Sequence, residues 1–178
     1  MSPEITTLTL ADVSRKPVSA AAHQPVHVLL TLFQGDPDLP LIAIADGGVF
    51  LGSVSRGELL NLLSRKYAMD LYARKPVSAL LDDLWGEKVV MRPELDINEA
   101  ALRLLSLDPV LQTEAFPLVR NGHCVGVVAV SDLMAAVARG QQRLLAELDR
   151  LNALLQEEQE RGCRRCGFKR SAPPNAPG

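Results

Sequence analysis

The chain has 178 residues, of which 47% are hydrophobic and 22% charged, and its formal net charge is −2 at pH 7. This length suits one compact domain or two very small domains that share an interface. The near-neutral charge gives no overall electrostatic reason to expect binding to nucleic acid. The N-terminus has no basic segment followed by an apolar one, and no window approaches 18 uninterrupted apolar residues, so we expect a cytoplasmic protein without a membrane segment.

The N-terminal segment contains two short patterns. Residues 5–10 alternate β-branched and apolar side chains, which predicts a short strand or an extended arm. Residues 15–19 read Arg-Lys-Pro-Val-Ser and should be extended, because the position before proline is disfavoured in a helix. The same five letters return at residues 74–78, which indicates an internal duplication.

A helix, a hairpin and a second helix follow in order. The spacing of apolar residues predicts a helix over 25–33, with a proline in its first turn. The glycine pair at 47–48 lies between apolar runs and predicts a hairpin turn. A leucine-rich helix over about 58–63 completes this first unit.

A second series of elements repeats this plan. Apolar stripes predict helices over 67–72 and 76–82 and a strand over 88–91. A capping box opens a predicted helix over 96–105. Asn-Gly at 121–122, flanked by apolar runs, is the strongest short hairpin signal.

The two hairpins are related by a constant shift along the chain. Matching Gly52 to Gly126 gives an offset of 74 residues (126 minus 52), and the same offset carries Glu58 onto Asp132. Each predicted unit therefore has an acid at the same place, just after its hairpin. The sequence predicts an α+β fold made of two strand, helix, hairpin, helix units packed as a pseudo-symmetric pair.

This duplicated unit resembles the tandem cystathionine-β-synthase-type (CBS) domain pair, and its linker is similar to those of CBS pairs in bacterial signalling proteins. The family pattern is Gly, two residues, Ser or Thr, two residues, Asp. Two sets of residues follow it with departures: Gly52, Ser55 and Glu58 in the first unit, and Gly126, Ala129 and Asp132 in the second. Glu58 is one methylene longer than the usual acid, and Ala129 lacks the hydroxyl.

The resemblance sets the expected domain organisation. The first CBS unit should span residues 12–66, and the linker with the second unit residues 67–139. A coiled-coil-like helical tail should cover 140–161. The basic, proline-rich end, residues 162–178, has no core-forming period, and we expect it to be disordered.

In this family a purine nucleotide commonly lies in the cleft between paired units, so the resemblance implies AMP, ATP or another adenosyl ligand. The implied binding residues are Ser55, Glu58, Ser131 and Asp132. A carboxylate at a helix start can accept ribose hydroxyls, while the helix N-terminus favours phosphate. The alternative is that Glu58, Ser131 and Asp132 only cap their helices.

The helical tail carries leucines at alternating spacings of three and four. Leu144, Leu148, Leu151 and Leu155 occupy d, a, d and a positions of a heptad, with Gln141 at the preceding a position. Two to three heptads are marginal alone. We therefore expect a homodimer, with this seam either between tails or against the partner's CBS units.

The three cysteines raise the question of metal binding. Cys163 and Cys166 form a single CxxC, whereas a tetrahedral zinc site needs two further ligands. A parallel dimer of the tail would bring two copies together as a four-cysteine site. The alternatives are free thiols and a redox role, and we do not expect zinc.

No nucleophile, histidine and acid motif and no phosphate-binding glycine loop occurs, so we do not expect an enzyme. The sequence predicts a small regulatory CBS-pair module that senses an adenine nucleotide and acts on an unidentified partner protein. One alternative is a dimerisation scaffold without ligand. The other is a nucleic-acid-associated protein that uses its basic CxxC tail.

Overall fold

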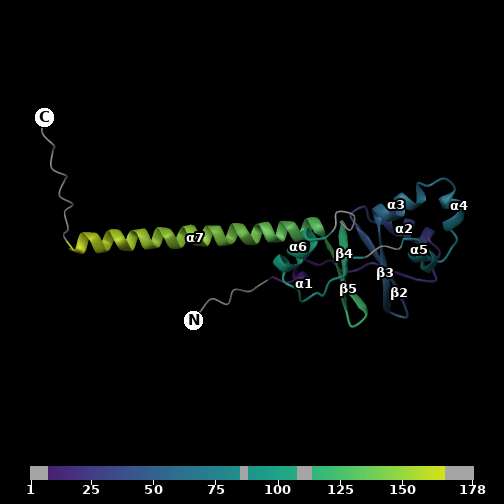
Figure 1. The fold of residues 1–178 in the computed structure, drawn as a ribbon, viewed down its shortest axis with the longest axis horizontal. Coiled ribbons are helices and arrows are strands. Elements are labelled where there is room, and N and C mark those ends of the chain that lie inside the picture. The colour runs from purple at the N-terminus through teal and green to yellow at the C-terminus, as the bar shows by residue number, and fades with distance from the viewer. Residues whose placement is uncertain (1–7, 85–87, 108–113, 167–178) are drawn as a thin grey trace, which may run out of the picture. The chain divides into compact units, whose positions relative to one another are not determined.

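The computed structural model describes residues 8–84, 88–107 and 114–166, with side chains described up to residue 161. Contacts divide the chain into two compact units, Met1–Val137 and Ala138–Gly178. The first unit contains all the strands of the described chain, and the second contains most of a long helix (Figure 1).

The first half of the Met1–Val137 unit forms a three-stranded sheet flanked by helices. Its elements are α1 (Leu10–Val13), β1 (Ser19–Ala21), α2 (His27–Gly35), β2 (Leu41–Asp46), β3 (Val49–Ser55) and α3 (Arg56–Leu63). Strand β1 pairs with β2 in parallel, and β2 pairs with β3 as an antiparallel hairpin.

The second half repeats the hairpin. After the linker come α4 (Ala68–Tyr72), α5 (Val77–Asp83), α6 (Ile97–Leu105), β4 (Ala115–Arg120), β5 (His123–Ala129) and α7 (Val130–Cys166). Strands β4 and β5 form a two-stranded antiparallel sheet. The α+β class and the two repeated hairpin units predicted from the sequence are confirmed.

Both hairpins turn at residues with positive φ. Gly47 and Gly48 have φ of 55° and 86°, and Asn121 and Gly122 have φ of 52° and 78°, as the tight turns that match strand twist require. The register of each hairpin shifts at equivalent places, between Ile44 and Ala45 in one and between Leu118 and Val119 in the other. The repeat thus extends to backbone detail.

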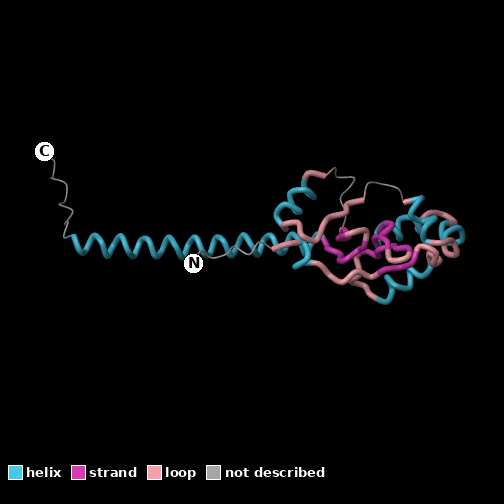
Figure 2. The backbone as a smooth tube through the Cα atoms, turned by 90° about the horizontal axis from the view of Figure 1, so that it is seen from below, coloured by secondary structure: helices cyan, strands magenta, loops and turns pink. Residues whose placement is uncertain are grey.

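The two hairpins lie side by side, and helices cover the outer side of each (Figures 1 and 2). The amide of Phe50 donates to the carbonyl of Gly122 at 2.7 Å, and Nδ1 of His123 lies 2.7 Å from the carbonyl oxygen of Gly48. The turns of the two hairpins are therefore tied to each other directly.

The segment that precedes each half in the chain packs into the core of the other half. The lead-in segment of the first half, residues 8–18, places Leu10 in the core of the second half. Helix α5 precedes the second half but places Val77 and Leu80 in the core of the first. Each half is thus completed by a segment that continues into the other.

Two predictions about the repeat were wrong. The strand expected over 88–91 is reduced to an isolated bridge between Met91 and Leu118. The five letters shared by residues 15–19 and 74–78 do not mark equivalent positions, because the first copy runs into β1 and the second runs into α5. Since Ala20 pairs with Ile44 and Met91 with Leu118, the equivalent of Ala20 is Met91.

The ends of the chain also differ from expectation. Leu10, expected at the end of a strand, begins α1, while residues 1–7 lie outside the described part. Helix α7 continues to Cys166, past residue 161 at which the helical tail was expected to end. Residues 167–178 also lie outside the described part, so the division into domains stays a prediction.

Within the described part, none of the helices has the length and apolar character needed to cross a membrane.

The two equivalent glycines give a matched stability test. A Cβ at Gly126 would lie 3.0 Å from Cβ of Ser14, whose neighbour Arg15 is fixed by two backbone bonds to Val127. A Cβ at Gly52 would meet only the end of the Leu81 side chain, at 3.2 Å. Gly126→Ala should therefore lower the free energy of unfolding by about 1–3 kcal/mol, and Gly52→Ala by less than about 1 kcal/mol. Urea denaturation measures both, and equal losses would contradict the assigned packing.

Candidate functional site

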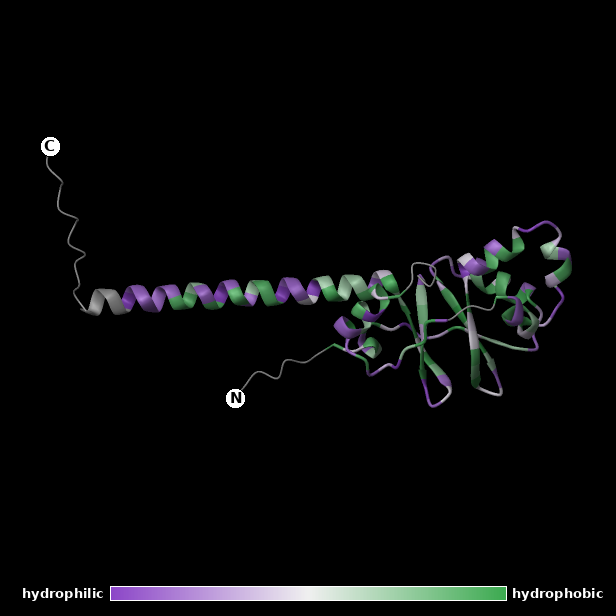
Figure 3. Cartoon of the chain, viewed as in Figure 1, coloured by the Kyte–Doolittle hydropathy of each residue, from purple (hydrophilic) through white to green (hydrophobic). Residues whose placement is uncertain are grey.

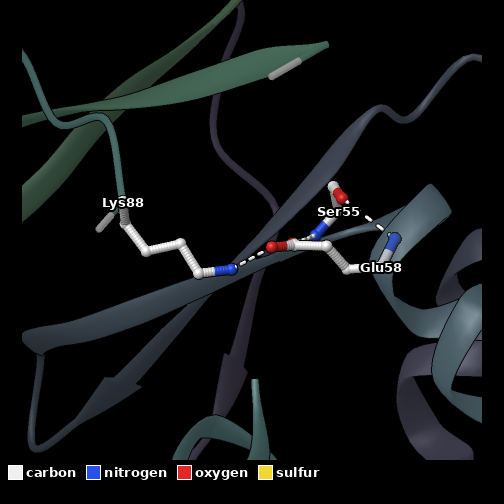
Figure 4. A network of polar contacts seen from close by, with 3 residues as sticks. All are labelled: Ser55, Glu58 and Lys88. Atoms are coloured by element: carbon white, nitrogen blue, oxygen red, sulfur yellow. Dashed lines mark hydrogen bonds and ion pairs between the residues drawn. The ribbon is translucent and has the colours of Figure 1, made fainter. Parts of the chain in front are cut away.

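The acid of the first half, Glu58, takes part in a helix cap and in an ion pair (Figure 4). Ser55 is the N-cap of α3: its Oγ accepts from the amide of Glu58 at 3.2 Å, and Oε2 of Glu58 accepts from the amide of Ser55 at 2.8 Å. Oε1 of Glu58 accepts from Nζ of Lys88. Both carboxylate oxygens are therefore engaged, one in the cap of α3 and the other in the ion pair.

These contacts determine the ionisation of Glu58. Burial raises the pKa of its carboxyl, but the hydrogen bond from Lys88, the backbone bond from Ser55 and the positive charge of Lys88 outweigh burial, so the net pKa lies below its ordinary value of 4.5. The group stays ionised at neutral pH and keeps its ion pair.

The acid of the second half is paired in an equivalent way. Oδ2 of Asp132 accepts from Nε of Arg15 at 3.0 Å and lies 2.7 Å from its terminal nitrogen. The cation of this pair is more open to solvent, with 53% of the Arg15 side chain exposed against 28% for Lys88, whereas the two acids are about equally exposed, Asp132 at 35% and Glu58 at 37%. Ser131, considered as a cap, lies inside the first turn of α7, because that helix begins at Val130.

Each acid is thus held by a cation from the lead-in of the other half. Arg15 precedes the first half and bonds the acid of the second, while Lys88 precedes the second half and bonds the acid of the first. Sequence reasoning missed both cations. The signal was present, since Arg15 and Lys88 are 73 residues apart and the acids 74.

A cavity of about 720 Å³ lies beside the second-half pair. It is lined by residues of both halves: Arg15, Asp38, Pro40, Glu114, Ala129, Val130 and Ser131. A cavity of about 360 Å³ lies beside Lys88, and its lining combines leucines with polar residues: Leu51, Gly52, Ser53, Ser78, Leu81, Asp82, Leu84 and Lys88. The structure therefore places Ser55 in contact with Glu58. It places Ser131 in the lining of a cleft that Arg15 also lines, and Arg15 is ion-paired with Asp132.

The described residues contain no cluster of three or more His, Cys, Asp or Glu side chains that could hold a metal ion. The predicted ligands Cys163 and Cys166 fall in the last turns of α7, where the side chains lie outside the described part. The proposed four-cysteine site across a dimer stays untested.

The Glu58 pair predicts a defined response to pH. Because its folded-state pKa is depressed, its stabilisation is present above about pH 4.5 and is lost as pH falls through the folded pKa. In Lys88→Met, burial of the carboxyl remains while the cation is gone, so the pKa of Glu58 should rise. Carboxyl NMR titration measures this, with Lys66→Met as the control for loss of a surface charge. An unchanged pKa in Lys88→Met would contradict the ion pair.

Comparisons with known proteins agree with this architecture. Residues 71–139 match the family model for the CBS domain. A comparison with curated proteins gave no match.

Solved CBS-domain structures share the fold at low sequence identity. A CBS domain-containing protein from Thermotoga maritima is 18% identical, with a TM-score of 0.57 over 75% of this chain and 96% of that one. CBSX2 in complex with AMP is 20% identical, with a TM-score of 0.57 over 75% and 98%. The CBS domain pair of MJ0100, in complex with 5′-methylthioadenosine and S-adenosyl-L-methionine, is 13% identical, with a TM-score of 0.57 over 76% and 98%. The chain therefore contains a CBS domain at residues 71–139 and has the fold of a tandem CBS-domain pair.

Proposed function

We propose that this CBS pair is a regulatory module, not an enzyme, that binds an adenine nucleotide in the cleft beside Asp132 and acts on a partner protein. The observation that carries the proposal is the cleft of about 720 Å³, whose lining includes Asp38 from one half and Ser131 from the other. Its volume is in the range of small-molecule sites. A ligand there would touch both halves at once.

Binding would exchange the Arg15–Asp132 pair for contacts with the ligand. Arg15 already lines the cleft and presents donors suited to a phosphate. Once Arg15 turns to the phosphate, the carboxylate of Asp132 is free to accept ribose hydroxyls. An exposed ion pair of this kind is worth only about 0–1 kcal/mol, so its exchange costs little.

The first half is the weaker candidate for the same chemistry. Both oxygens of Glu58 are engaged, one by Lys88 and one by the Ser55 amide. A ribose at Glu58 would have to displace Lys88, which is less exposed than Arg15, and would also have to open a helix cap, which costs about 0.5–2 kcal/mol. We therefore assign the ligand to the Asp132 cleft.

The charges around the cleft limit the ligand. Arg15 is accompanied by two carboxylates, Asp38 and Glu114. One phosphate group can be matched by Arg15, whereas a triphosphate would place additional negative charge near these acids. AMP fits this balance better than ATP. The complexes of the similar structures with AMP and with adenosyl compounds support an adenosyl ligand as a class.

A scaffold without ligand is the second candidate. It is favoured by the engagement of both acids, by Lys88 and Arg15, and by Ala129, which lacks the hydroxyl of the family pattern. A nucleic-acid role rests only on the basic tail, most of which lies beyond the described residues. Strongly salt-dependent binding to nucleic acid would identify that role.

Ligand titration separates the sensor from the scaffold. AMP should raise the free energy of unfolding, by about 2.7 kcal/mol when its concentration is 100 times its dissociation constant. ATP without magnesium should bind more weakly. Thermal unfolding and calorimetry with AMP, ATP and S-adenosylmethionine give both answers. If none of these compounds stabilises the protein at millimolar concentration, the scaffold without ligand is the candidate that remains.

The role of Asp132 is tested by one isosteric change. Asp132→Asn should weaken AMP binding by about 1–3 kcal/mol, because the ribose hydroxyls lose a charged acceptor. Asp149→Asn, on the exposed part of α7, makes the same chemical change at a residue that does not line the cleft, and this variant should bind AMP as the parent does. Calorimetry on both variants compares the affinities. Equal affinity of the folded Asp132→Asn variant and the parent would remove Asp132 from the site.

A further inference from the structure

The helix of the Ala138–Gly178 unit carries an exposed apolar stripe. Hydrophobic positions recur between hydrophilic ones along α7 (Figure 3). Its six leucines are each between 48% and 62% exposed: Leu144, Leu145, Leu148, Leu151, Leu154 and Leu155. Within a single copy of the described chain, this stripe is left largely in water.

The stripe has an internal symmetry. The positions 144 and 155, 145 and 154, and 148 and 151 are each equidistant from the midpoint between Asp149 and Arg150. Two such helices that run in opposite directions, related by a two-fold axis at this midpoint, would place a leucine opposite a leucine in all of these pairs. In the heptad frame, such an axis also brings each a position opposite a d position.

We propose that this stripe pairs with the same stripe of a second copy of the chain, with the two helices antiparallel. The leucines alone would allow a parallel pair as well, since identical positions then meet. The polar residues within and beside the stripe decide between the two arrangements. This pairing does not depend on the ligand proposed above.

The polar ends of the seam favour the antiparallel arrangement. Glu158 continues the seam at a d position, and Gln141 precedes it at an a position; they too are equidistant from the midpoint. In a parallel pair, Glu158 would face Glu158 of the other copy, and facing like charges are destabilising. In the antiparallel pair it faces Gln141, whose amide can donate to the carboxylate.

The charges outside the seam point the same way. Residues 138–146 carry Arg139 and Arg143 and no acid, whereas residues 156–161 carry three acids and one arginine. A parallel pair would set each of these segments against its own copy. The antiparallel pair sets the basic segment against the acidic one, which is the complementary arrangement.

The antiparallel pair has a consequence for the cysteines. Each CxxC lies about 15 residues from the midpoint, so two such segments would be separated by roughly 45 Å along the helix axis. A four-cysteine zinc site shared across this dimer could not form. The four-cysteine site considered in the sequence analysis required the parallel arrangement.

Spin labels on the full-length chain measure the orientation. Arg143, Arg150 and Glu157 are spaced by seven residues, so they share one face of α7. Single cysteines at these positions, with Cys124, Cys163 and Cys166 replaced by serine, allow double electron–electron resonance between copies. The antiparallel pair predicts axial separations of about 2 Å at position 150 and about 20 Å at positions 143 and 157, so the label distance should be shortest at 150.

Equal label distances at the three positions would show a parallel pair and overturn the proposal. A monomer at high micromolar concentration, or a dimer without defined distances between the tails, would overturn it as well.

The pairing also predicts that Leu148→Asp with Leu151→Asp shifts the protein towards monomer in sedimentation. Ala146→Asp with Ala153→Asp, which adds the same charges on the opposite side of the helix, should not. Equal dimerisation of the two double variants would contradict the seam.

A single substitution distinguishes the two orientations, because it should change the dissociation constant of the dimer in opposite directions. Gln141→Lys should tighten the antiparallel dimer about two- to five-fold, because the lysine faces Glu158 of the other copy. In a parallel dimer the same lysines would face each other and weaken it. Gln142→Lys, one position away from the seam, is the charge-matched control. Sedimentation equilibrium compares the dissociation constants, and a weaker Gln141→Lys dimer would contradict the antiparallel arrangement.

Discussion

The organisation of this CBS pair depends on the crossing of each lead-in segment to the opposite half. Arg15 exchanges two backbone hydrogen bonds with Val127 of β5, at 2.8 and 3.0 Å. Helix α5 in turn completes the core of the first half through Val77 and Leu80. Arg15 lies in the first of these segments, and Lys88 follows α5 in the chain and precedes the second half. Because each acid is paired with a cation that precedes the other half, the state of each acid is coupled to the contact between the halves.

For the proposed ligand, this coupling would provide a physical route to a change in the contact between the halves. The two acids occupy equivalent places in the repeat, yet Glu58 is held in a cap and an ion pair, whereas Asp132 has a more exposed arginine as its partner. A ligand that takes Arg15 from Asp132 alters a contact between the two halves. It can shift a conformational equilibrium only by the difference between its affinities for the two states.

The sequence predicted the features that local chemistry determines. The turns at Gly47 and Asn121 followed from dipeptides that favour positive φ, and the equivalence of Glu58 and Asp132 followed from the repeat. The partners of these acids were missed, because Arg15 and Lys88 reach them only after the chain has crossed between halves. Residues 15–19 and 74–78 show the same limit, since identical letters lead into a strand in one place and a helix in the other.

Amide NMR with AMP as the probe shows whether an adenine nucleotide binds at the Asp132 cleft. Backbone amide spectra of the full chain, recorded with increasing AMP, report where the ligand binds without any substitution. Binding at this cleft should produce saturable shifts at Arg15, Val130, Ser131 and Asp132, with smaller changes around Ser55. Unchanged spectra at millimolar AMP, or saturable shifts that spare all four residues, would contradict it.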